Sequence, residues 1–378
     1  MATTQKALST SNSESPLRLA ARCGLFFAPL AALLGFAAVT LYVAGELMPP
    51  RDLVSRQAVS PAIYYPIYQP KSPYPSYKIE AVTQRRPEVL ILGDSRGFSI
   101  RSEFALAPEK FYNATLIGAN EIGTVRAFLE HLPQRQLPRQ AILVIDPWWF
   151  RQGAKIHPVD DYFDPASRME VFNFAWRNGI YWGLLHSLFS QPAEYIGVNA
   201  TLQHAGFRAD GSFRAGLRWL ALDPNSQSLA LKGEMDKVDQ WSRSGHAGMS
   251  ADAVDEIRRL LSFCKTHHVR LIAYLTALHP TLYQAARQDR RLDYFWDLKR
   301  VLNPLFQENG ARFFEFQDPS VANCGAPEYL DILHESEVCT VRVLRAMAQR
   351  DPSVAEIFKV QKFEALLDHR ASDWQLGF

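Results

Sequence analysis

The stretch Val89-Leu90-Ile91-Leu92-Gly93-Asp94-Ser95 decides the fold predicted for this chain. Its four apolar residues form a short continuous run, which is typical of a strand buried on both faces of a parallel sheet. A glycine ends the run, and a serine follows in the next turn. Ligands of open α/β sheets bind beyond the carboxyl ends of the strands. Ser95 is therefore the first candidate functional residue.

Four further apolar runs have the length of strands, and amphipathic stretches separate most of them. The predicted strands span residues 88–92, 113–117, 141–145, 269–275 and 312–316, and the predicted helices span 121–132, 251–267 and 282–308. This alternation predicts an α/β domain whose parallel sheet is covered by helices on both faces. Ser250 is a predicted N-cap, and Asn309-Gly310 is a predicted helix end.

Each candidate functional residue follows one of these strands. In strand order they are Ser95, Gly118, Asp146, His279, and the pair Asp331 and His334. Because the carboxyl ends of parallel strands meet at one edge of the sheet, we expect these residues to converge there.

The motif Asp331-Ile332-Leu333-His334 supplies the partners that a nucleophilic serine needs. A serine needs a histidine to accept its proton and a carboxylate to hold that histidine in the right tautomer. The spacing lets Asp331 face Nδ1 of His334 while Nε2 faces Ser95. The pattern predicts an enzyme that acts on acyl esters. In the alternative interpretation, Ser95 caps a helix and His334 is an ordinary surface residue.

Four neighbouring residues are further candidates for substrate contact or for support of the site. Asp94 is expected to stabilise the turn, and Asp146, which precedes a proline, is expected to end its strand. Arg96 either binds an anionic sugar or phosphate or is a solvated surface residue. His279 is a substrate contact, a rival base or, as we favour, a residue that supports the site from behind.

VLILGDSRG (89–97) and the late DILH (331–334) resemble the SGNH, or GDSL, hydrolase superfamily. The resemblance covers about residues 87–350, apart from an insertion. It implies a three-layer α/β/α sandwich with a flavodoxin-like parallel sheet. It also implies Ser95 as nucleophile, His334 as base and Asp331 as the orienting acid, with no metal or organic cofactor.

The resemblance also implies an oxyanion hole made by the backbone N–H groups of Ser95 and Gly118. The third sequence block of the family carries an asparagine as a further donor. Here that block reads Val144-Ile145-Asp146-Pro147-Trp148-Trp149 and has no asparagine. Asn120 is a candidate replacement, and the third donor stays open.

A divergent third block behind a membrane anchor is similar to one subgroup, the teichoic-acid D-alanine transfer and alginate O-acetylation proteins. This similarity implies acyl transfer, such as acetyl transfer, to or from an envelope or exopolysaccharide through an acyl-Ser95 intermediate. It also implies a membrane-bound O-acyltransferase as partner. Two alternatives are a plain esterase of small or lipid esters and a non-catalytic scaffold that binds glycan or the acyltransferase.

Residues 23–45 contain no charge and are long enough to cross the ~30 Å hydrocarbon core as a helix. Lys6, Arg18 and Arg22 precede this run against the single acid Glu14, which predicts a cytoplasmic N-terminus. The run is longer than the usual ~7–15-residue core of a signal peptide and lacks a small-residue cleavage site. We therefore expect an uncleaved single-pass anchor in a bacterial inner membrane, with the catalytic domain in the periplasm.

The formal net charge of the 378 residues is +2, and the chain has no basic block and no zinc-type Cys/His spacing. Nucleic acid is therefore not an expected partner. The predicted organisation is a cytoplasmic tail (1–22), the anchor (23–47), an extended Pro/Tyr-rich spacer without regular helix (48–84), the α/β domain (85–350) and a C-terminal extension (351–378). An insertion (148–248) is expected to cover the site or to form a helical subdomain without a ligand role.

Cys324 and Cys339 flank the Asp331–His334 motif. A disulfide between them would restrain the loop that carries two candidate catalytic residues. Two buried free thiols are the alternative, and spacing alone does not decide between them.

Overall fold

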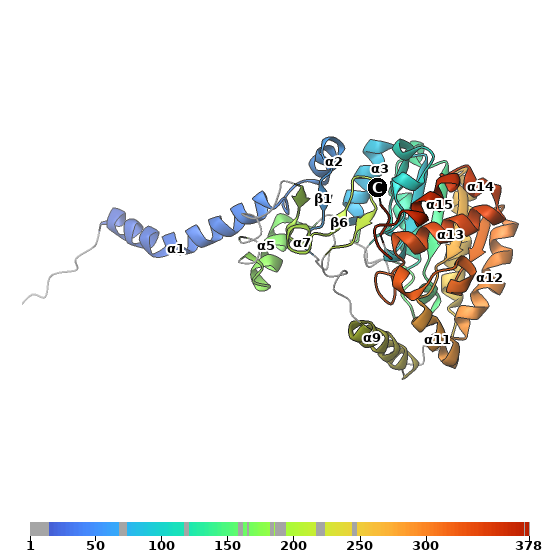
Figure 1. The fold of residues 1–378 in the computed structure, drawn as a ribbon. Coiled ribbons are helices and arrows are strands. Elements are labelled where there is room, and N and C mark those ends of the chain that lie inside the picture. Colours follow the sequence, from blue (N-terminus) through green and yellow to red (C-terminus); the bar gives the residue numbers. More distant parts are fainter. Residues whose placement is uncertain are drawn as a thin grey trace, which may run out of the picture.

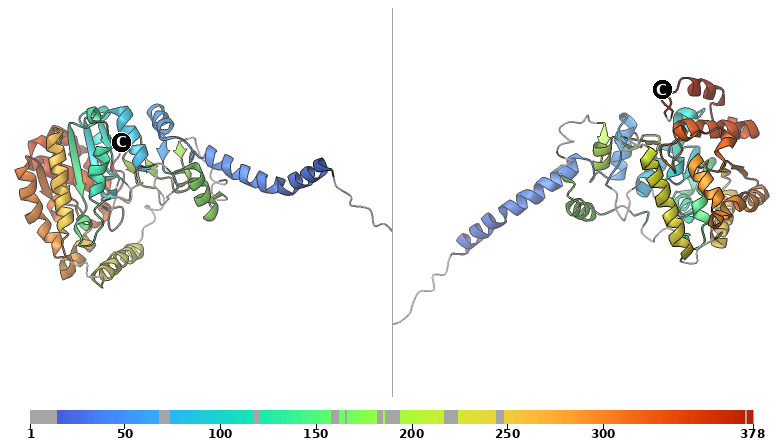
Figure 2. Two further views of the ribbon diagram at one scale, coloured as in Figure 1. Left: turned by 180° about the vertical axis from the view of Figure 1, so that it is seen from behind. Right: turned by 60° about the horizontal axis from the view of Figure 1, so that its bottom comes forward.

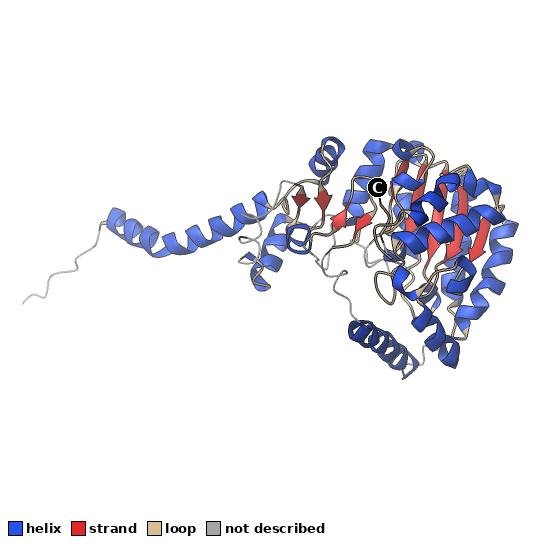
Figure 3. Ribbon diagram, viewed as in Figure 1, coloured by secondary structure: helices blue, strands red, loops and turns tan. Residues whose placement is uncertain are grey.

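The computed structural model describes residues 15–67, 74–116, 121–157, 162–164, 166–181, 185, 194–216, 224–243, 248–373 and 375–377. An α/β domain lies beside a smaller sheet, and a long N-terminal helix extends away from both (Figure 1). Figure 3 shows the strands of the larger sheet between layers of helix.

The larger sheet consists of five parallel strands. They are β2 (Val89–Gly93), β3 (Phe111–Asn113), β4 (Gln140–Ile145), β8 (Arg270–Leu275) and β9 (Arg312–Glu315). Their order in the sheet is β3-β2-β4-β8-β9, and every pairing is parallel. Numbered along the chain, the order is 2-1-3-4-5. The predicted parallel α/β sheet is therefore confirmed.

The second strand ends earlier than predicted. The expected strand was 113–117, but β3 ends at Asn113. The side-chain oxygen of Asn113 accepts hydrogen bonds from the backbone N–H and the hydroxyl of Thr115, at 3.1 and 2.5 Å. Such a local side-chain turn competes with continued strand geometry.

Side chains alternate between the two faces of the sheet, and helices cover both. On one face Leu90 and Leu143 pack in a core that includes residues of α3 (Tyr74–Arg85), α4 (Gly123–Glu130), α10 (Ala251–Thr266) and α12 (Tyr294–Glu308). On the other face Ile91 and Ile142 join a core with residues of α13 (Glu337–Arg350) and α15 (Val360–Asp368). The C-terminal extension, with α14 (Pro352–Ala355) and α15, is thus part of this second layer (Figure 2).

The predicted helix ends are confirmed at α10 and α12. Ser250 caps α10 by accepting the N–H of Ala253 at 3.2 Å. Asn309 ends α12, and Gly310 follows with a φ of 68°. The single helix predicted over 282–308 is wrong, because α11 (Pro280–Gln288) and α12 are separate. Asp289 ends α11 and caps the intervening turn by accepting the N–H of Arg291 at 3.0 Å.

Residues 48–84 do not form the expected extended spacer. They contain α2 (Pro50–Val59), β1 (Ile63–Tyr64) and most of α3. The prolines at the start of α2 and α3 lie in the first helical turn, where the missing N–H costs no internal hydrogen bond. Tyr74 and Tyr77 are buried against the domain, so the segment packs as part of the folded body.

The insertion divides into two parts. One contains α5 (Arg168–Arg177), β5 (Tyr195–Ile196), α7 (Val198–Gln203), β6 (Gly206–Phe207) and β7 (Phe213–Arg214). Its strands form the smaller sheet, in the order β5-β1-β6-β7, together with β1 of the N-terminal segment. The other part is α9 (Pro224–Arg243), which lies at the same end of the domain as α11 (Figure 1).

The N-terminal helix α1 (Pro16–Val43) is long and apolar enough to cross a membrane. The chain just after α1 is fixed to the smaller sheet. Glu46 accepts the N–H groups of Ile67 and Val198 at 3.0 and 2.6 Å, and the N–H of Gly197 donates to the carbonyl of Ala44 at 2.6 Å.

Candidate active site

The turn after β2 presents Ser95 because of the two residues before it. Gly93 has a φ of 139°, and a Cβ at this position would lie 2.6 Å from the carbonyl oxygen of Val144. Only glycine fits this close approach of two strands. Asp94 then accepts the N–H of Arg96 at 3.0 Å and caps the short helical turn Ser95–Gly97. Ser95 is the first residue of that turn.

Ser95, His334 and Asp331 form one hydrogen-bonded chain. Nε2 of His334 lies 2.9 Å from Oγ of Ser95. Nδ1 of His334 lies 2.8 Å from both carboxylate oxygens of Asp331. A proton on Nδ1 donated to the carboxylate leaves Nε2 free to accept the serine proton. The three side chains therefore have the geometry of a nucleophile, a base and an orienting acid.

The loop itself holds Asp331 in place as a carboxylate. Its Oδ1 accepts the backbone N–H groups of Leu333 and His334 at 2.7 and 2.8 Å. Burial acts to raise its pKa, but the charge and hydrogen bond of His334 and these two N–H groups outweigh it. The pKa of Asp331 consequently lies below its ordinary value, and the group stays ionised at neutral pH.

Arg96 connects three segments of the site and is not a solvated surface residue. Only 2% of its side chain is exposed. Its Nη1 donates to the carbonyl of Leu333 at 2.7 Å, and its Nε lies 3.0 Å from Oδ2 of Asp146. The Ser95 turn, the end of β4 and the Asp331–His334 loop are thereby joined through one guanidinium group.

Asp94 and Asp146 form a buried pair of carboxyl groups below Ser95. Burial raises the pKa of Asp94 well above its ordinary value, and the charge of Asp146 and a hydrogen bond between the two side chains raise it further. The nearby guanidinium of Arg96 opposes this shift, and Arg96 forms an ion pair with Asp146. Asp146 also accepts the N–H of Trp148 at 2.9 Å, as expected for a residue that ends a strand.

His279 is not a rival base. It is 1% exposed, and its Nδ1 accepts the N–H of Thr281 at 3.2 Å as the N-cap of α11. Burial lowers its pKa, against the opposing charge of Asp331. The neutral ring packs edge-on against Tyr329, with ring centroids 5.1 Å apart. His279 thus supports the loops behind the site.

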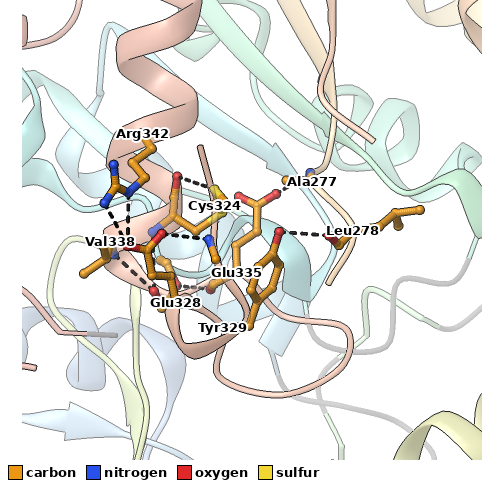
Figure 4. Close-up of a disulfide and its surroundings, with 12 residues drawn as sticks. Ala277, Leu278, Cys324, Glu328, Tyr329, Glu335, Val338 and Arg342 are labelled. Carbon is orange, nitrogen blue, oxygen red and sulfur yellow. Dashed lines mark hydrogen bonds and ion pairs between the residues drawn. A yellow bond between two sulfur atoms is a disulfide. The ribbon is translucent and has the colours of Figure 1, made fainter. Parts of the chain in front are cut away.

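A disulfide and two hydrogen bonds restrain the loop that carries His334 (Figure 4). Cys324 and Cys339 are bonded, which settles the question that their spacing left open. The hydroxyl of Tyr329 donates to the carbonyl of Leu278 at 2.9 Å. Glu335 accepts the N–H of Ala277 at 2.7 Å. Residues on both sides of His334 are therefore tied to the segment that follows β8.

A cavity of about 380 Å³ opens over Ser95. Its lining comes from the Ser95 turn and the His334 loop, from the chain after β4 and from α9: Asp94, Ser95, Arg96, Asp146, Trp148, Trp149, Arg151, Glu234, Lys237, Trp241, Leu333 and His334. The rings of Trp148 and Trp241 meet edge-on at 5.4 Å, and the guanidinium of Arg151 lies 3.9 Å from the centre of the Trp241 ring. One part of the insertion, α9, therefore forms a wall of the cavity. This agrees with the expectation that the insertion covers the site.

Sequence reasoning expected the insertion at the site but did not identify the individual residues of the cavity wall. Trp148 and Arg151 directly follow β4, so the rule that placed Asp146 at the sheet edge could have identified them as well. Nothing in the sequence of α9 indicated that Trp241 would reach the same cavity. The predicted oxyanion residues Gly118 and Asn120 lie outside the described residues.

Among the described residues no group of three or more His, Cys, Asp or Glu is placed to hold a metal ion. Comparison of the chain with protein-family models and with curated proteins found no match. A functional assignment therefore depends on the geometry of the site.

Proposed function

We propose that this protein is an extracytoplasmic serine acyl-ester enzyme of the SGNH type, which transfers an O-acyl group, such as acetyl, to or from an envelope or exopolysaccharide. The observation that carries the proposal is the 2.9 Å distance between Oγ of Ser95 and Nε2 of His334, with Asp331 on the other ring nitrogen. The strand order 2-1-3-4-5 supports the SGNH assignment, because it is the order of a flavodoxin-like sheet.

The chemistry has two half-reactions. Oγ of Ser95 attacks the carbonyl carbon of the donor ester while its proton passes to Nε2 of His334. The oxyanion is stabilised by backbone N–H groups, those of Ser95 and Gly118 being our candidates, with Asn120 as a further donor. The alcohol leaves with the proton from His334, which gives an acyl-Ser95 ester. A sugar hydroxyl, or water, then delivers its proton to His334 and attacks this ester, which regenerates Ser95.

The wall of the cavity supports a carbohydrate substrate. Trp148 and Trp241 present aromatic surface next to the charged groups of Arg151 and Lys237. Aromatic faces pack against the apolar face of a sugar ring, and adjacent charged groups can hydrogen-bond its hydroxyls. The acyl donor is proposed to reach the site from a membrane-bound O-acyltransferase, in line with the sequence resemblance.

Two observations support placement outside the cytoplasm, on a bacterial inner membrane. Arg18 and Arg22 precede the apolar run, which favours a cytoplasmic N-terminus for α1. The domain also contains the Cys324–Cys339 disulfide, and such bonds persist in oxidising compartments.

A fluorophosphonate probe tests the central claim, because it labels serines that a neighbouring base activates. We expect labelling of the full-length protein and its loss in Ser95→Ala, with Ser102→Ala as a control, since the hydroxyl of Ser102 donates to Glu103 and not to the loop that carries His334. Intact protein that stays unlabelled while folded would instead favour a non-catalytic scaffold.

Transfer and hydrolysis differ only in the acceptor that reaches acyl-Ser95. An acetyl-labelled ester donor, incubated with the enzyme in the presence and absence of polysaccharide, separates them. We expect label on the polymer when it is present. Label that appears only as free acetate at every polymer concentration would identify a plain esterase.

A further inference from the structure

Helix α5 packs against the membrane-spanning candidate helix α1 and the segments next to its exit. Val171 and Ala175 of α5 share an apolar core with Ala37 and Leu41 of α1. Figures 1 and 2 show α5 beside the end of α1 that leads into the domain, running across α1 and not along it. The contact fixes α5 at one level along the axis of α1.

That level lies near one boundary of the apolar run. Leu41 and Ala37 precede Gly45, the last residue of the uncharged run, by about one and two helical turns. The run of about 34 Å slightly exceeds the ~30 Å hydrocarbon core. A helix that touches α1 at this level is therefore at the depth of the lipid headgroups and the adjoining acyl chains.

α5 exposes an apolar stripe next to the face that packs on α1. Met169 is 66% exposed and Trp176 is 46% exposed. Phe172 lies between them on the helix and is half-buried, with its ring parallel to that of Trp176 at 6.4 Å. Positions 169, 172 and 176 share one face by helical spacing. The stripe is thus a surface that water would solvate poorly.

Apart from the half-buried Phe174, the residues of α5 outside the stripe and the packed face are polar. Asn173 and Arg177 are exposed on the side away from the packed residues, and Arg168 is exposed at the start of the helix. Tryptophan, phenylalanine and methionine on one face with arginines beside them are typical of helices that lie in a membrane interface. Tryptophan in particular is enriched at headgroup depth.

We propose that α5 lies flat in the headgroup region of the leaflet in which α1 ends, with Met169, Phe172 and Trp176 in contact with lipid. The occupant of this surface is the phospholipid bilayer itself, because α5 packs on α1 near the boundary of the apolar run, where Val39 and Tyr42 of α1 are themselves 61% and 74% exposed. The domain therefore contacts the membrane at two places. This inference does not depend on the acyl-transfer chemistry.

The test is site-directed spin labelling of the full-length protein in nanodiscs of phosphatidylethanolamine and phosphatidylglycerol. Single cysteines replace Met169, Trp176 and, as a control on the polar side, Arg177. The background removes both free thiols, through Cys23→Ser and Cys264→Ala, and keeps the disulfide. Leu229→Cys on exposed α9 serves as a second water-facing control. Unchanged thermal unfolding shows that each labelled variant is folded.

Oxygen partitions into lipid and a nickel chelate stays in water, so the ratio of their effects on the label reports depth. We expect a ratio several-fold higher at 169 and 176 than at 177 and 229. Equal ratios at all four positions would overturn the proposal and place α5 in water. Low accessibility to both reagents at 169 and 176 would also overturn it, because the stripe would then be covered by protein, either a second copy or a partner.

Discussion

Two neighbouring segments at the carboxyl edge of the sheet each contain a histidine, and the two histidines have different environments. His334, in the loop after β9, faces the hydroxyl of Ser95 and is oriented by Asp331. His279, in the segment after β8, is almost fully buried and caps a helix. Both lie at the edge where sequence reasoning looked for a site. Position at the edge is therefore not sufficient, and the partner of each ring nitrogen decides what the histidine can do.

The two segments also depend on each other mechanically. Glu335 and Tyr329 of the His334 loop bind the backbone of Ala277 and Leu278 in the segment after β8. The segment after β8 therefore supports the loop that contains His334. Variants that affect either the proton-accepting role of His334 or the supporting role of the segment with His279 test this difference directly.

The largest expected effect comes from removing His334. In His334→Ala no base accepts the proton of Ser95, and turnover of an acyl ester should fall by on the order of 10⁴–10⁶. The change is to be measured as kcat with a chromogenic acetate ester. Activity within tenfold of the native protein would mean that another group, His279 included, serves as the base.

Glu335 joins the two segments and should make stability depend on pH. Burial raises its pKa to about 8, against the opposing effects of the Ala277 N–H and Arg96, so the folded state holds a proton that the unfolded state releases near pH 4.5. The contribution of protonated Glu335 to the free energy of unfolding is therefore complete below pH 4.5. It is lost as the pH rises towards 8, and the loss is on the order of a few kcal/mol. Glu335→Gln should flatten this part of the unfolding free energy profile, measured by denaturant titration from pH 5 to 9. An unchanged profile would assign the pH dependence to other groups.

Arg96→Lys should show whether Arg96 positions the His334 loop or contacts the substrate. A lysine ammonium is a single point charge and cannot reach both Asp146 and the carbonyl of Leu333 as the guanidinium does. Misplacement of the His334 loop relative to Ser95 should lower kcat by about 10²-fold, while KM changes little. A change in KM alone would show that Arg96 contacts substrate and does not position the loop.

The smallest effect is expected at His279. His279→Ala removes the cap of α11 and should lower the free energy of unfolding by about 1 kcal/mol, with kcat little changed. His279→Asn retains an oxygen that can accept the N–H of Thr281 and should recover most of that loss. A large fall in kcat in both variants would show that His279, like His334, is needed for turnover, and would contradict its assignment as a structural residue.

Much of the fold could be predicted because the relevant signals are local. The apolar runs around Leu90, Ile142 and Ile272 predicted strands that lie side by side in the structure. Ser250 predicted the start of α10 for the same reason. The end of β3 was misplaced because the side-chain turn at Asn113 has no apolar signature. Residues 48–84 were wrongly predicted to lack regular helix. The prolines were taken to exclude a helix, although those at the start of α2 and α3 lie in the first turn, where proline is tolerated.

The candidate catalytic residues could be predicted from their sequence pattern, whereas their surroundings could not. Asp331 and His334 are close in sequence, so one loop brings them together. Arg96 gained its role only through contacts with Leu333 and Asp146, which are distant in sequence. Trp241 reaches the cavity from a helix whose sequence resembles any amphipathic surface helix. Contacts between residues far apart in the sequence produce no periodic pattern in it, so they could not be predicted.

The carboxylate of Glu46 has a consequence for where the protein can work. It fastens the exit of α1 to Ile67 and Val198 within a few residues of the apolar run, so no slack chain separates α1 from the folded body. If α1 spans a membrane, as we propose, the body cannot swing freely at the end of a flexible linker. Its cavity would then stay at a constant distance from the lipid surface, and only polymers that pass through that thin layer of solvent would reach it.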